Sequence, residues 1–268
     1  MRATSPLAVI GLTAFLVFGA VTTPAHAAQV TTTFDGVTYT ADDTNISAGA
    51  TATDYNPASG PAVTIPSTVT MGGTDYTVTT IGNGAFFDNF LTSVTLPNTL
   101  TTIGGYAFAT NFLTSVALPN TLTTIGNGAF FGNSLTTVTL PSTVITIGDF
   151  AFAFASNPLT SVKFLGAVPA SFGFGVFTSG PVVSYYWRYG APQTTGGFTT
   201  PSWRGYTTEA IAILTYDTNG GTAIDPAEIV VGETATAPVA PTKTDYTFDG
   251  WYTALTGGTA WNFTTDNV

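Results

Sequence analysis

The stretch at residues 80–101, TIGNGAFFDNFLTSVTLPNTLT, decides the fold because the chain repeats it. Its opening triplet, Thr80-Ile81-Gly82, returns at residues 102–104, 124–126 and 146–148, each time 22 positions later. A fixed period of about 20–50 residues is typical of solenoids, in which every unit forms one coil and stacks on its neighbours. The sequence therefore predicts a stack of coils that share one continuous core.

Each unit also contains the pattern L-x-x-V-x-L-P, as at Leu91, Val94, Leu96 and Pro97. Val94 and Leu96 alternate with Thr95, so the two apolar side chains face one side and the threonine faces the other. We expect one short parallel strand per coil. The proline ends that strand because it cannot donate a ladder hydrogen bond, and the glycine of T-I-G permits a second corner.

Two more residue types recur in register within the coils. An asparagine stands two residues before the first leucine of each strand, where a stacked amide can satisfy buried backbone groups, an interpretation we favour over a binding role. A phenylalanine recurs after T-I-G-x-x-A and is expected to form an internal aromatic stack. The asparagines are Asn89, Asn111, Asn133 and Asn157, and the phenylalanines are Phe86, Phe108, Phe130 and Phe152.

Irregular units predict caps at both ends of the stack, which would otherwise expose an apolar core. Upstream, residues 63–66 copy the strand and its proline, and an insertion with Gly72-Gly73 at its turn indicates a β-hairpin. Downstream, two extra residues lie around Phe154-Ala155, and an aromatic run at residues 172–187 indicates a C-terminal cap. The expected segments are a signal peptide (1–27), an N-terminal segment (28–60), the solenoid with caps (61–180), a cap and linker (181–210) and a second module (211–268).

The first 27 residues have the composition of a secretory signal peptide. Met1-Arg2 precede an apolar run at residues 7–21, and Ala25-His26-Ala27 forms a cleavage site. A membrane anchor is the alternative, but the run is shorter than the about 20 residues that span a bilayer. We therefore expect a secreted product from Ala28 onward, extracellular or associated with the cell surface, with no membrane insertion after removal of the signal.

The predicted mature product lacks most catalytic chemistry. It has no cysteine, and the one histidine, His26, leaves with the signal, which excludes histidine-based triads, disulfides and cysteine- or histidine-bound metals. With Arg2 removed, four basic residues face 15 acidic ones, a net charge of −11 that does not fit nucleic acid. A glycosidase would need paired carboxylates, yet Asp88 and Asp149 lie on different coils without a second acid beside them. We expect no enzyme activity, no cofactor and no metal.

A second module follows the solenoid. Residues 213–221 indicate a strand and a tight Asn219-Gly220 turn, and three further extended pieces are expected near residues 228–233, 246–252 and 257–263. Asp217-Thr218-Asn219 has the spacing that begins a calcium loop, but the later ligands are missing and a hairpin turn is the favoured interpretation.

Both regions resemble known repeat families. The units I-G-x-x-A-F-x-x-N-x-L-T-S-V-T-L-P resemble the BspA-like (Treponema-type) leucine-rich repeat over about residues 61–180. The strings YDTNGG, APVAPTK, YTFDGWY and GGTAWNF resemble the Listeria–Bacteroides repeat, similar to the internalin B B-repeat, a small β-grasp-like module. The first resemblance implies secreted or surface-anchored bacterial proteins, several of them adhesins, with non-catalytic repeats. The second implies one more strand, so we expect this module to be truncated at Val268.

The fold class expected from these observations is mainly β, a leucine-rich-repeat solenoid followed by a small β-grasp-like module. If the strands line the inner face of the arc, their outward residues form a small, hydroxyl-rich candidate binding face for an extracellular protein or glycan. The alternative is that small residues simply fit a crowded sheet. The face comprises Ser93, Thr95, Ser115, Ala117, Thr137, Thr139, Ser161 and Lys163.

A secondary candidate patch combines aromatic and arginine side chains near the C-terminal cap, a composition typical of interface hot spots. Cap packing is its alternative interpretation. The patch comprises Tyr185, Trp187, Arg188, Trp203 and Arg204, beside Tyr186. The function predicted from the sequence is a secreted surface binding protein or adhesin; the alternatives are a structural spacer and a solenoid that binds an ordered lattice such as ice.

Overall fold

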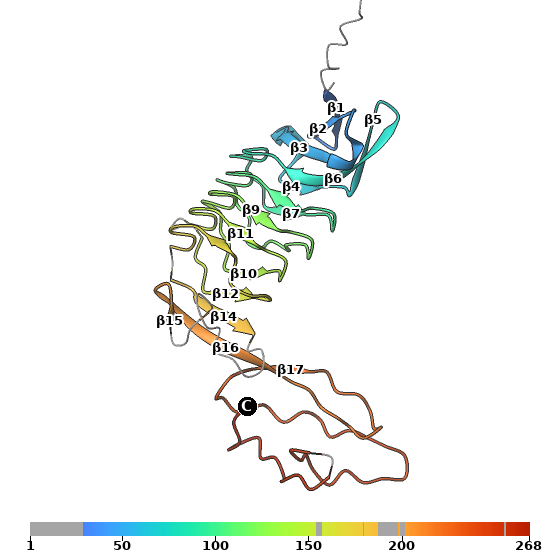
Figure 1. Ribbon diagram of the computed structural model, residues 1–268, viewed down its shortest axis with the longest axis vertical. Helices are drawn as coiled ribbons and strands as arrows, with labels where there is room; N and C mark the ends of the chain where they lie inside the picture. The colour runs from blue at the N-terminus through green and yellow to red at the C-terminus, as the bar shows by residue number, and fades with distance from the viewer. Residues whose placement is uncertain (1–28, 154–156, 179, 187–197, 199–201, 255) are drawn as a thin grey trace, which may run out of the picture.

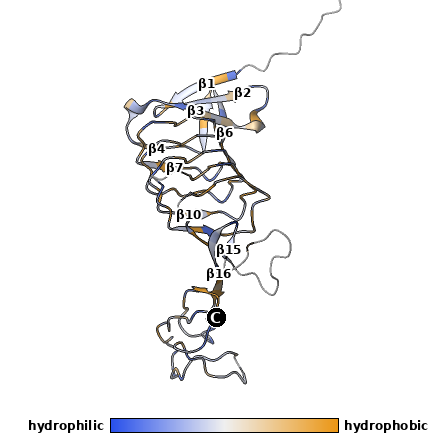
Figure 2. Cartoon of the chain, turned by 90° about the vertical axis from the view of Figure 1, so that its left-hand side faces the viewer, coloured by the Kyte–Doolittle hydropathy of each residue, from blue (hydrophilic) through white to orange (hydrophobic). Residues whose placement is uncertain are grey.

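The computed structural model describes residues 29–153, 157–178, 180–186, 198, 202–254 and 256–268 (Figure 1). In these ranges the chain forms 17 β-strands and two 3-10 turns, Ile46–Ala48 and Pro57–Ser59, and no α-helix. The predicted signal peptide, Phe154-Ala155, Trp187 and Arg188 lie outside the described residues. Figure 2 shows the coils edge-on, stacked between β4 (Ala62–Thr64) and β10 (Thr137–Leu140). The mainly β solenoid predicted from the 22-residue period is confirmed.

The Thr-Ile pair of each T-I-G triplet forms a ladder, although the sequence suggested only a corner at its glycine. β6 (Thr74–Ile81) pairs in parallel with the next coil, and each later coil continues the ladder. The coil therefore contains two short parallel strands instead of the one expected. The later members of this ladder are β8 (Thr102–Ile103), β9 (Thr124–Ile125), β11 (Thr146–Ile147) and β13 (Ser171–Phe172).

The triplet glycine serves close packing between coils. A Cβ atom built on Gly126 would lie 2.5 Å from the backbone nitrogen of Gly105, and one on Gly148 would lie 2.4 Å from that of Asn127. Real Cβ atoms do not approach backbone so closely, so only glycine lets successive coils stack here. From the sequence, we expect this glycine to provide conformational freedom at a corner. The structure shows instead that glycine is needed there because a side chain would collide with the neighbouring coil.

The L-x-x-V-x-L segments form the expected second ladder, but with an interruption. β4 (Ala62–Thr64) pairs in parallel with β7 (Ser93–Thr95), and a second sheet begins at β10 (Thr137–Leu140). Between them, residues 115–118 have no strand assignment. The second sheet continues in parallel through β12 (Ser161–Phe164), β14 (Val182–Tyr186) and β16 (Tyr206–Leu214).

The core contains the predicted aromatic stack. Phe86, Phe108, Phe130 and Phe152 are fully buried, and their successive ring centroids are 5.0, 5.5 and 5.2 Å apart in nearly parallel planes. Burying a side chain of this size contributes about 1.5–3 kcal/mol, but only when a neighbouring coil covers it. The stack therefore joins the coils into one cooperative unit.

The predicted asparagine ladder is present at Asn111, Asn133 and Asn157, whereas Asn89 is only half-buried. The side-chain Nδ2 of Asn111 donates to the carbonyl oxygen of Phe86 at 2.7 Å, and its Oδ1 accepts from the backbone nitrogen of Leu91 at 2.9 Å. Asn133 and Asn157 repeat this arrangement one and two coils later, and all three are buried. These amides satisfy backbone groups at a corner that water does not reach.

Three antiparallel pairings and one parallel pairing build the N-terminal cap. β1 (Gln29–Phe34), β2 (Val37–Asp42) and β3 (Ala50–Tyr55) extend the Thr-Ile ladder at its first coil, with β3 parallel to β6. β5 (Thr68–Met71) and β6 form the hairpin predicted at Gly72-Gly73. The cap therefore includes residues 29–60, which were predicted from the sequence only to lead into the cap.

The C-terminal cap and the second module share one strand. β15 (Ser202–Trp203) pairs with the first part of β16, and β17 (Ala227–Val230) pairs with its last part at residues 211–214. β16 thus crosses the boundary expected between residues 210 and 211. In Figure 1 it runs out of the solenoid and into the module.

The second module contains fewer regular strands than the sequence indicated. The Asn219-Gly220 turn is present, with φ values of 49° and 77° and a 2.9 Å hydrogen bond from the Gly221 nitrogen to the Thr218 carbonyl oxygen. It does not join two adjacent strands, because β16 ends at Leu214 and its partner β17 begins at Ala227. The later extended pieces contribute isolated bridges, among them Tyr252 to Ala260.

Candidate functional site

The strands that carry the predicted hydroxyl face are β7, β10 and β12, and the last two are paired in register. Ser93, Thr95, Thr137 and Thr139 are exposed, while Val138 between the last two is buried. Ser161 and Lys163 stand beside Thr137 and Thr139 on the next strand and are half-buried. The ladder thus presents the outward side chains that the alternation predicted, but whether they bind a ligand stays a prediction.

Ser115 and Ala117 lie where this face is interrupted. No backbone hydrogen bond joins residues 115–118 to either neighbouring coil within the described chain. Val116 and Leu118 remain partly buried, whereas their counterparts Val138 and Leu140 are buried. A groove of about 330 Å³ lies between the second and third coils here, lined by Ser115, Val116, Ala117, Leu118, Asn120, Thr137, Val138, Thr139, Pro141 and Leu165.

Lys163 connects the face to the second module. Its Nζ forms an ion pair with the carboxylate of Glu228 on β17. The lysine side chain is 23% exposed and the glutamate 45%. The amine therefore takes part in a contact between the solenoid and the module at the edge of the predicted face.

The secondary patch predicted near the cap is largely inside it. Tyr185 and Trp203 are buried, and Trp203 packs against Phe164, Phe172 and Phe198 at centroid distances of 4.8–6.1 Å. Their burial favours the cap-packing interpretation for these two residues. Arg204 is exposed, with its guanidinium carbon 5.3 Å from the ring centroids of both Phe172 and Trp203. Trp187 and Arg188 lie outside the described residues.

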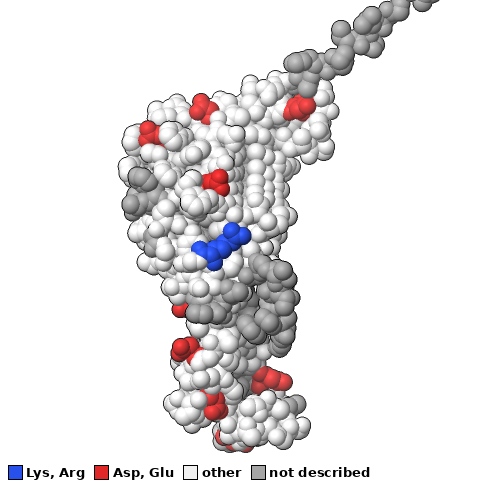
Figure 3. Space-filling view, turned by 60° about the vertical axis from the view of Figure 1, so that its left-hand side comes forward, with Lys and Arg blue, Asp and Glu red and all other residues white. Residues whose placement is uncertain are grey.

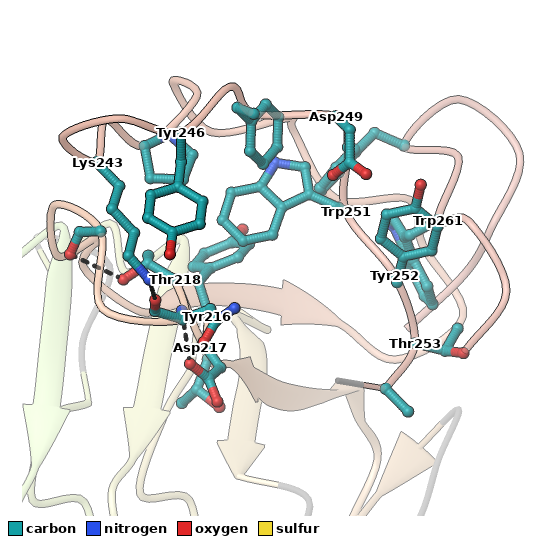
Figure 4. A pocket seen from close by; sticks show the side chains of 18 of the residues that line it. Tyr216, Asp217, Thr218, Lys243, Tyr246, Asp249, Trp251, Tyr252, Thr253 and Trp261 are labelled. Carbon is teal, nitrogen blue, oxygen red and sulfur yellow. Dashed lines mark hydrogen bonds between the residues drawn. The ribbon is translucent and has the colours of Figure 1, made fainter. Parts of the chain in front are cut away.

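The second module holds a pocket that the sequence did not indicate. Its volume is about 710 Å³, and Figure 4 shows Tyr216, Trp251 and Trp261 facing it from different segments. Tyr216 and Trp251 pack at a centroid distance of 5.2 Å, and burial raises the pKa of the Tyr216 hydroxyl. Lys243 donates to the Asn219 carbonyl oxygen at 2.7 Å and lies over the ring of Tyr246. Tyr216, Trp251 and Trp261 are half-buried and Tyr246 is exposed, so the pocket is open to solvent.

Exposed aromatic rings occur on the T-I-G-x-x-A-F arm of the coils and just after it, and we call this set of residues the aromatic edge. Their exposed fractions range from 40% to 76%, whereas the phenylalanines of the internal stack are fully buried. Sequence reasoning treated phenylalanine on this arm as core and missed this set. The aromatic edge comprises Phe87, Phe90, Tyr106, Phe112, Phe150 and Phe174.

Tyr106 and Phe150 occupy one position of the coil in which glycine otherwise stands. The backbone nitrogens of Gly84, Tyr106, Gly128 and Phe150 each donate to the carbonyl oxygen of a residue 21–24 positions later, so the four are equivalent in the stack. All four have left-handed φ values, between 54° and 63°. Glycine adopts this conformation without strain, whereas an aromatic residue does so at a cost of about 1–2 kcal/mol.

The carboxylates do not form a catalytic pair. Asp149 accepts a 2.7 Å hydrogen bond from the backbone nitrogen of Phe174, one coil further on, and thereby joins the inter-coil contacts. Asp88 is exposed, with a φ of 54°, and its backbone nitrogen donates to Ala109. In the described part of the chain, no three acidic or histidine side chains gather in a way that could hold a metal ion.

Charge is sparse on the solenoid. Between Arg2 and Lys163 the sequence contains no lysine or arginine, and residues 80–160 contain only Asp88 and Asp149 as acids. Figure 3 shows one face of the molecule, on which separated acidic groups and one basic group stand in a wide uncharged surface. Contacts on this surface therefore depend on shape, hydrogen bonds and apolar area.

Comparison with known families gives two matches. Residues 74–178 match the BspA type leucine rich repeat region in six copies, and residues 213–268 match the Listeria-Bacteroides repeat domain. Both agree with the resemblances found in the sequence. None of the described helices is both long and apolar enough to cross a bilayer.

Individual relatives cover limited parts of the chain. Internalin H of Listeria monocytogenes is 64% identical over 31 residues, 12% of this chain and 6% of that protein. The chain thus matches only a small fraction of that relative's length. A leucine-rich repeat protein from Bacteroides capillosus is similar to 58% of this chain over 98% of its own, with 24% identity and a TM-score of 0.38. One from Bacteroides ovatus is similar to 58% over 47% of its own, with 23% identity and a TM-score of 0.38.

Proposed function

From a chain that contains BspA-type leucine-rich repeats and a Listeria–Bacteroides repeat, we propose a secreted or cell-surface protein that binds an extracellular protein or glycan through its solenoid. Both repeat types are typical of surface or secreted proteins and of binding modules rather than enzymes. The observation that carries the proposal is the set of exposed or half-buried small polar side chains on β7, β10 and β12, of which β10 and β12 are paired in register.

The physical basis is a rigid surface whose hydroxyl groups need no ordering. Thr137 and Thr139 stand beside Ser161 and Lys163 on a paired strand, so their backbone positions are fixed before any partner arrives. Preorganised groups lose little conformational entropy on binding, which favours recognition by several weak hydrogen bonds. The nearby groove at residues 115–118 adds a concave element to an otherwise flat face.

The test is binding of the chain from Ala28 onward to an array of matrix proteins and glycans. Four substitutions to arginine, at Ser93, Thr95, Thr137 and Thr139, should weaken capture by about tenfold or more because bulky charges cover the face. Thr31→Arg with Thr33→Arg, two exposed positions on β1, is the matched control. Capture that survives the fourfold variant, or no capture of any partner by the parent, contradicts the proposal and favours a spacer or lattice-binding role.

A further inference from the structure

We propose that the aromatic edge is a binding platform for a neutral polysaccharide chain. The inference rests on the proposed binding role but assigns a separate contact to a different side of the coil, with its own ligand class. The first observation is exposure: Phe90 and Phe112 are 59% and 55% exposed and stack on each other at 6.1 Å. Phe150 and Phe174 form a second exposed pair, edge to face at 5.6 Å.

The second observation is backbone strain at three of these rings. Phe90, Tyr106 and Phe150 have φ values of 57°, 54° and 57°. Bulky residues rarely adopt the left-handed region, and such residues cluster at functional sites. Glycine fills the position of Tyr106 and Phe150 in two other coils, as Gly84 and Gly128, so the fold itself does not require a ring there. An aromatic residue that is both strained and half-exposed gains little from packing, which indicates a role toward a ligand.

The third observation is the way that each ring is supported. A Cβ atom built on Gly128 would lie 2.5 Å from the ring of Tyr106. A Cβ atom built on Gly175 would likewise lie 2.7 Å from the ring of Phe150. Each ring therefore rests on the glycine of the next coil, which fixes its position. Tyr106 is nevertheless 50% exposed to solvent and Phe150 is 40% exposed.

The spacing suits a linear ligand. Tyr106 and Phe150 occupy equivalent positions two coils apart. Because neighbouring backbone segments in such ladders are about 4.8 Å apart, the two ring-bearing positions are about 9–10 Å apart. This distance is comparable with the two-sugar repeat of an extended pyranose chain. The negative face of an aromatic ring attracts the polarised C–H groups on the flat side of a sugar ring. Stacking on Tyr106 and Phe150 thus offers contacts to two sugars that are separated by one other sugar.

The charge pattern decides between ligand classes. Residues 80–160 contain no basic residue, so a sulfated, phosphorylated or uronic acid polymer would find no counter-charge along these coils. Asp88 and Asp149 are the acids of residues 80–160, too few to attract a polycation. A neutral polysaccharide meets an apolar and nearly uncharged surface without a desolvation penalty for charge.

The experiment is co-sedimentation of the chain from Ala28 onward with insoluble neutral polysaccharides, namely cellulose, chitin, mannan and β-1,3-glucan. We expect retention on at least one of them and no retention on heparin or pectate beads. The double variant Tyr106→Gly with Phe150→Gly removes two rings and places glycine, which adopts the left-handed conformation without strain, at both positions. The variant should therefore fold, and its affinity for the polysaccharide should fall about tenfold or more. Phe112→Ala with Phe174→Ala, at positions of ordinary φ, is a second variant with the same expected loss.

Phe34→Ala is the matched control, since Phe34 is 57% exposed on β1 and lies outside the aromatic edge. Unchanged retention of both double variants, retention on anionic polymers alone, or no retention of the parent overturns the inference. The arginine variant of the hydroxyl face separates the two proposals. It should keep its retention on the neutral polysaccharide, whereas the aromatic-edge variants should keep their binding to the array partner of the hydroxyl face.

Discussion

The side-chain Nδ2 of Asn133 donates a 2.8 Å hydrogen bond to the carbonyl oxygen of Phe108, which lies 25 residues earlier and one coil away. The same side chain accepts from the backbone nitrogen of Leu113 at 3.1 Å and donates to the carbonyl oxygen of Phe130 at 3.1 Å. One fully buried amide thus serves three backbone groups at the interface between two coils.

Replacing this amide should be among the more costly single changes in the solenoid. Asn133→Leu leaves those buried backbone groups without a partner, and each such group costs about 1–3 kcal/mol, so we expect a loss of about 3 kcal/mol or more in the free energy of unfolding. Urea denaturation measures it. Asn83→Ala is the control, because the Oδ1 of Asn83 accepts from Gly105 at an exposed site and its loss should cost less than about 1 kcal/mol. Equal losses for the two variants would contradict this account.

Two glycines with the same backbone conformation should respond differently to alanine. Gly72 and Gly128 have φ values of 58° and 59°, but a Cβ on Gly72 meets nothing within 4 Å whereas one on Gly128 meets the Tyr106 ring. Gly72→Ala should cost about 1–2 kcal/mol for the strained backbone. Gly128→Ala should cost about 1–3 kcal/mol more, and the excess should vanish in a Tyr106→Gly background. A persistent excess in that background would show that the ring is not its cause.

The ion pair between Lys163 and Glu228 should contribute little to stability. Both side chains are partly exposed, and such pairs contribute about 1 kcal/mol or less. Glu228→Gln should therefore lower the thermal midpoint only slightly, and about 1 M salt should remove the difference. Lys243→Met is the comparison, because Lys243 donates to a carbonyl oxygen and lies over Tyr246, so its loss should depend less on salt. A salt-independent loss above about 2 kcal/mol for Glu228→Gln would contradict the expectation.

Tyr39 should make the protein less stable in alkali. Burial, together with the charge of Asp35, raises the pKa of the Tyr39 hydroxyl above its usual range, and this buried oxygen has no hydrogen-bond partner among the described residues. Above about pH 10 the unfolded chain releases a proton that the folded chain retains, so stability falls as the pH rises. Tyr39→Phe should leave stability at pH 7 nearly unchanged and make this fall shallower, as followed by urea denaturation at pH 8–11.

Tyr55→Phe is the control for that experiment. The Tyr55 hydroxyl donates to the carbonyl oxygen of Gly60 at 2.6 Å, so its removal should cost about 1 kcal/mol at pH 7. If Tyr39→Phe proves as costly as Tyr55→Phe at pH 7, the Tyr39 hydroxyl has a partner in solution.

The core of the solenoid could be predicted from the sequence because a 22-residue period places like residues above one another. Phe86 and Asn111 were both predicted correctly from register alone. The ladder at the Thr-Ile pairs was missed because a strand of two residues is too short to show an alternation of apolar and polar side chains. The aromatic edge was missed because Tyr106 and Gly128 look unrelated until the coils are stacked. Hydrophobicity indicates that a phenylalanine is apolar, but only the fold shows which side of the arm it occupies.

β16 also has a mechanical consequence. Its first half is locked beside β14 in the solenoid, and its last residues pair with β17 in the module, so the junction couples the two parts instead of acting as a swivel. A force applied to the module would travel along this strand into the solenoid. There it would load the parallel hydrogen bonds between residues 183–186 and 208–211 in shear, all together, and not one after another as in an unzipping hairpin.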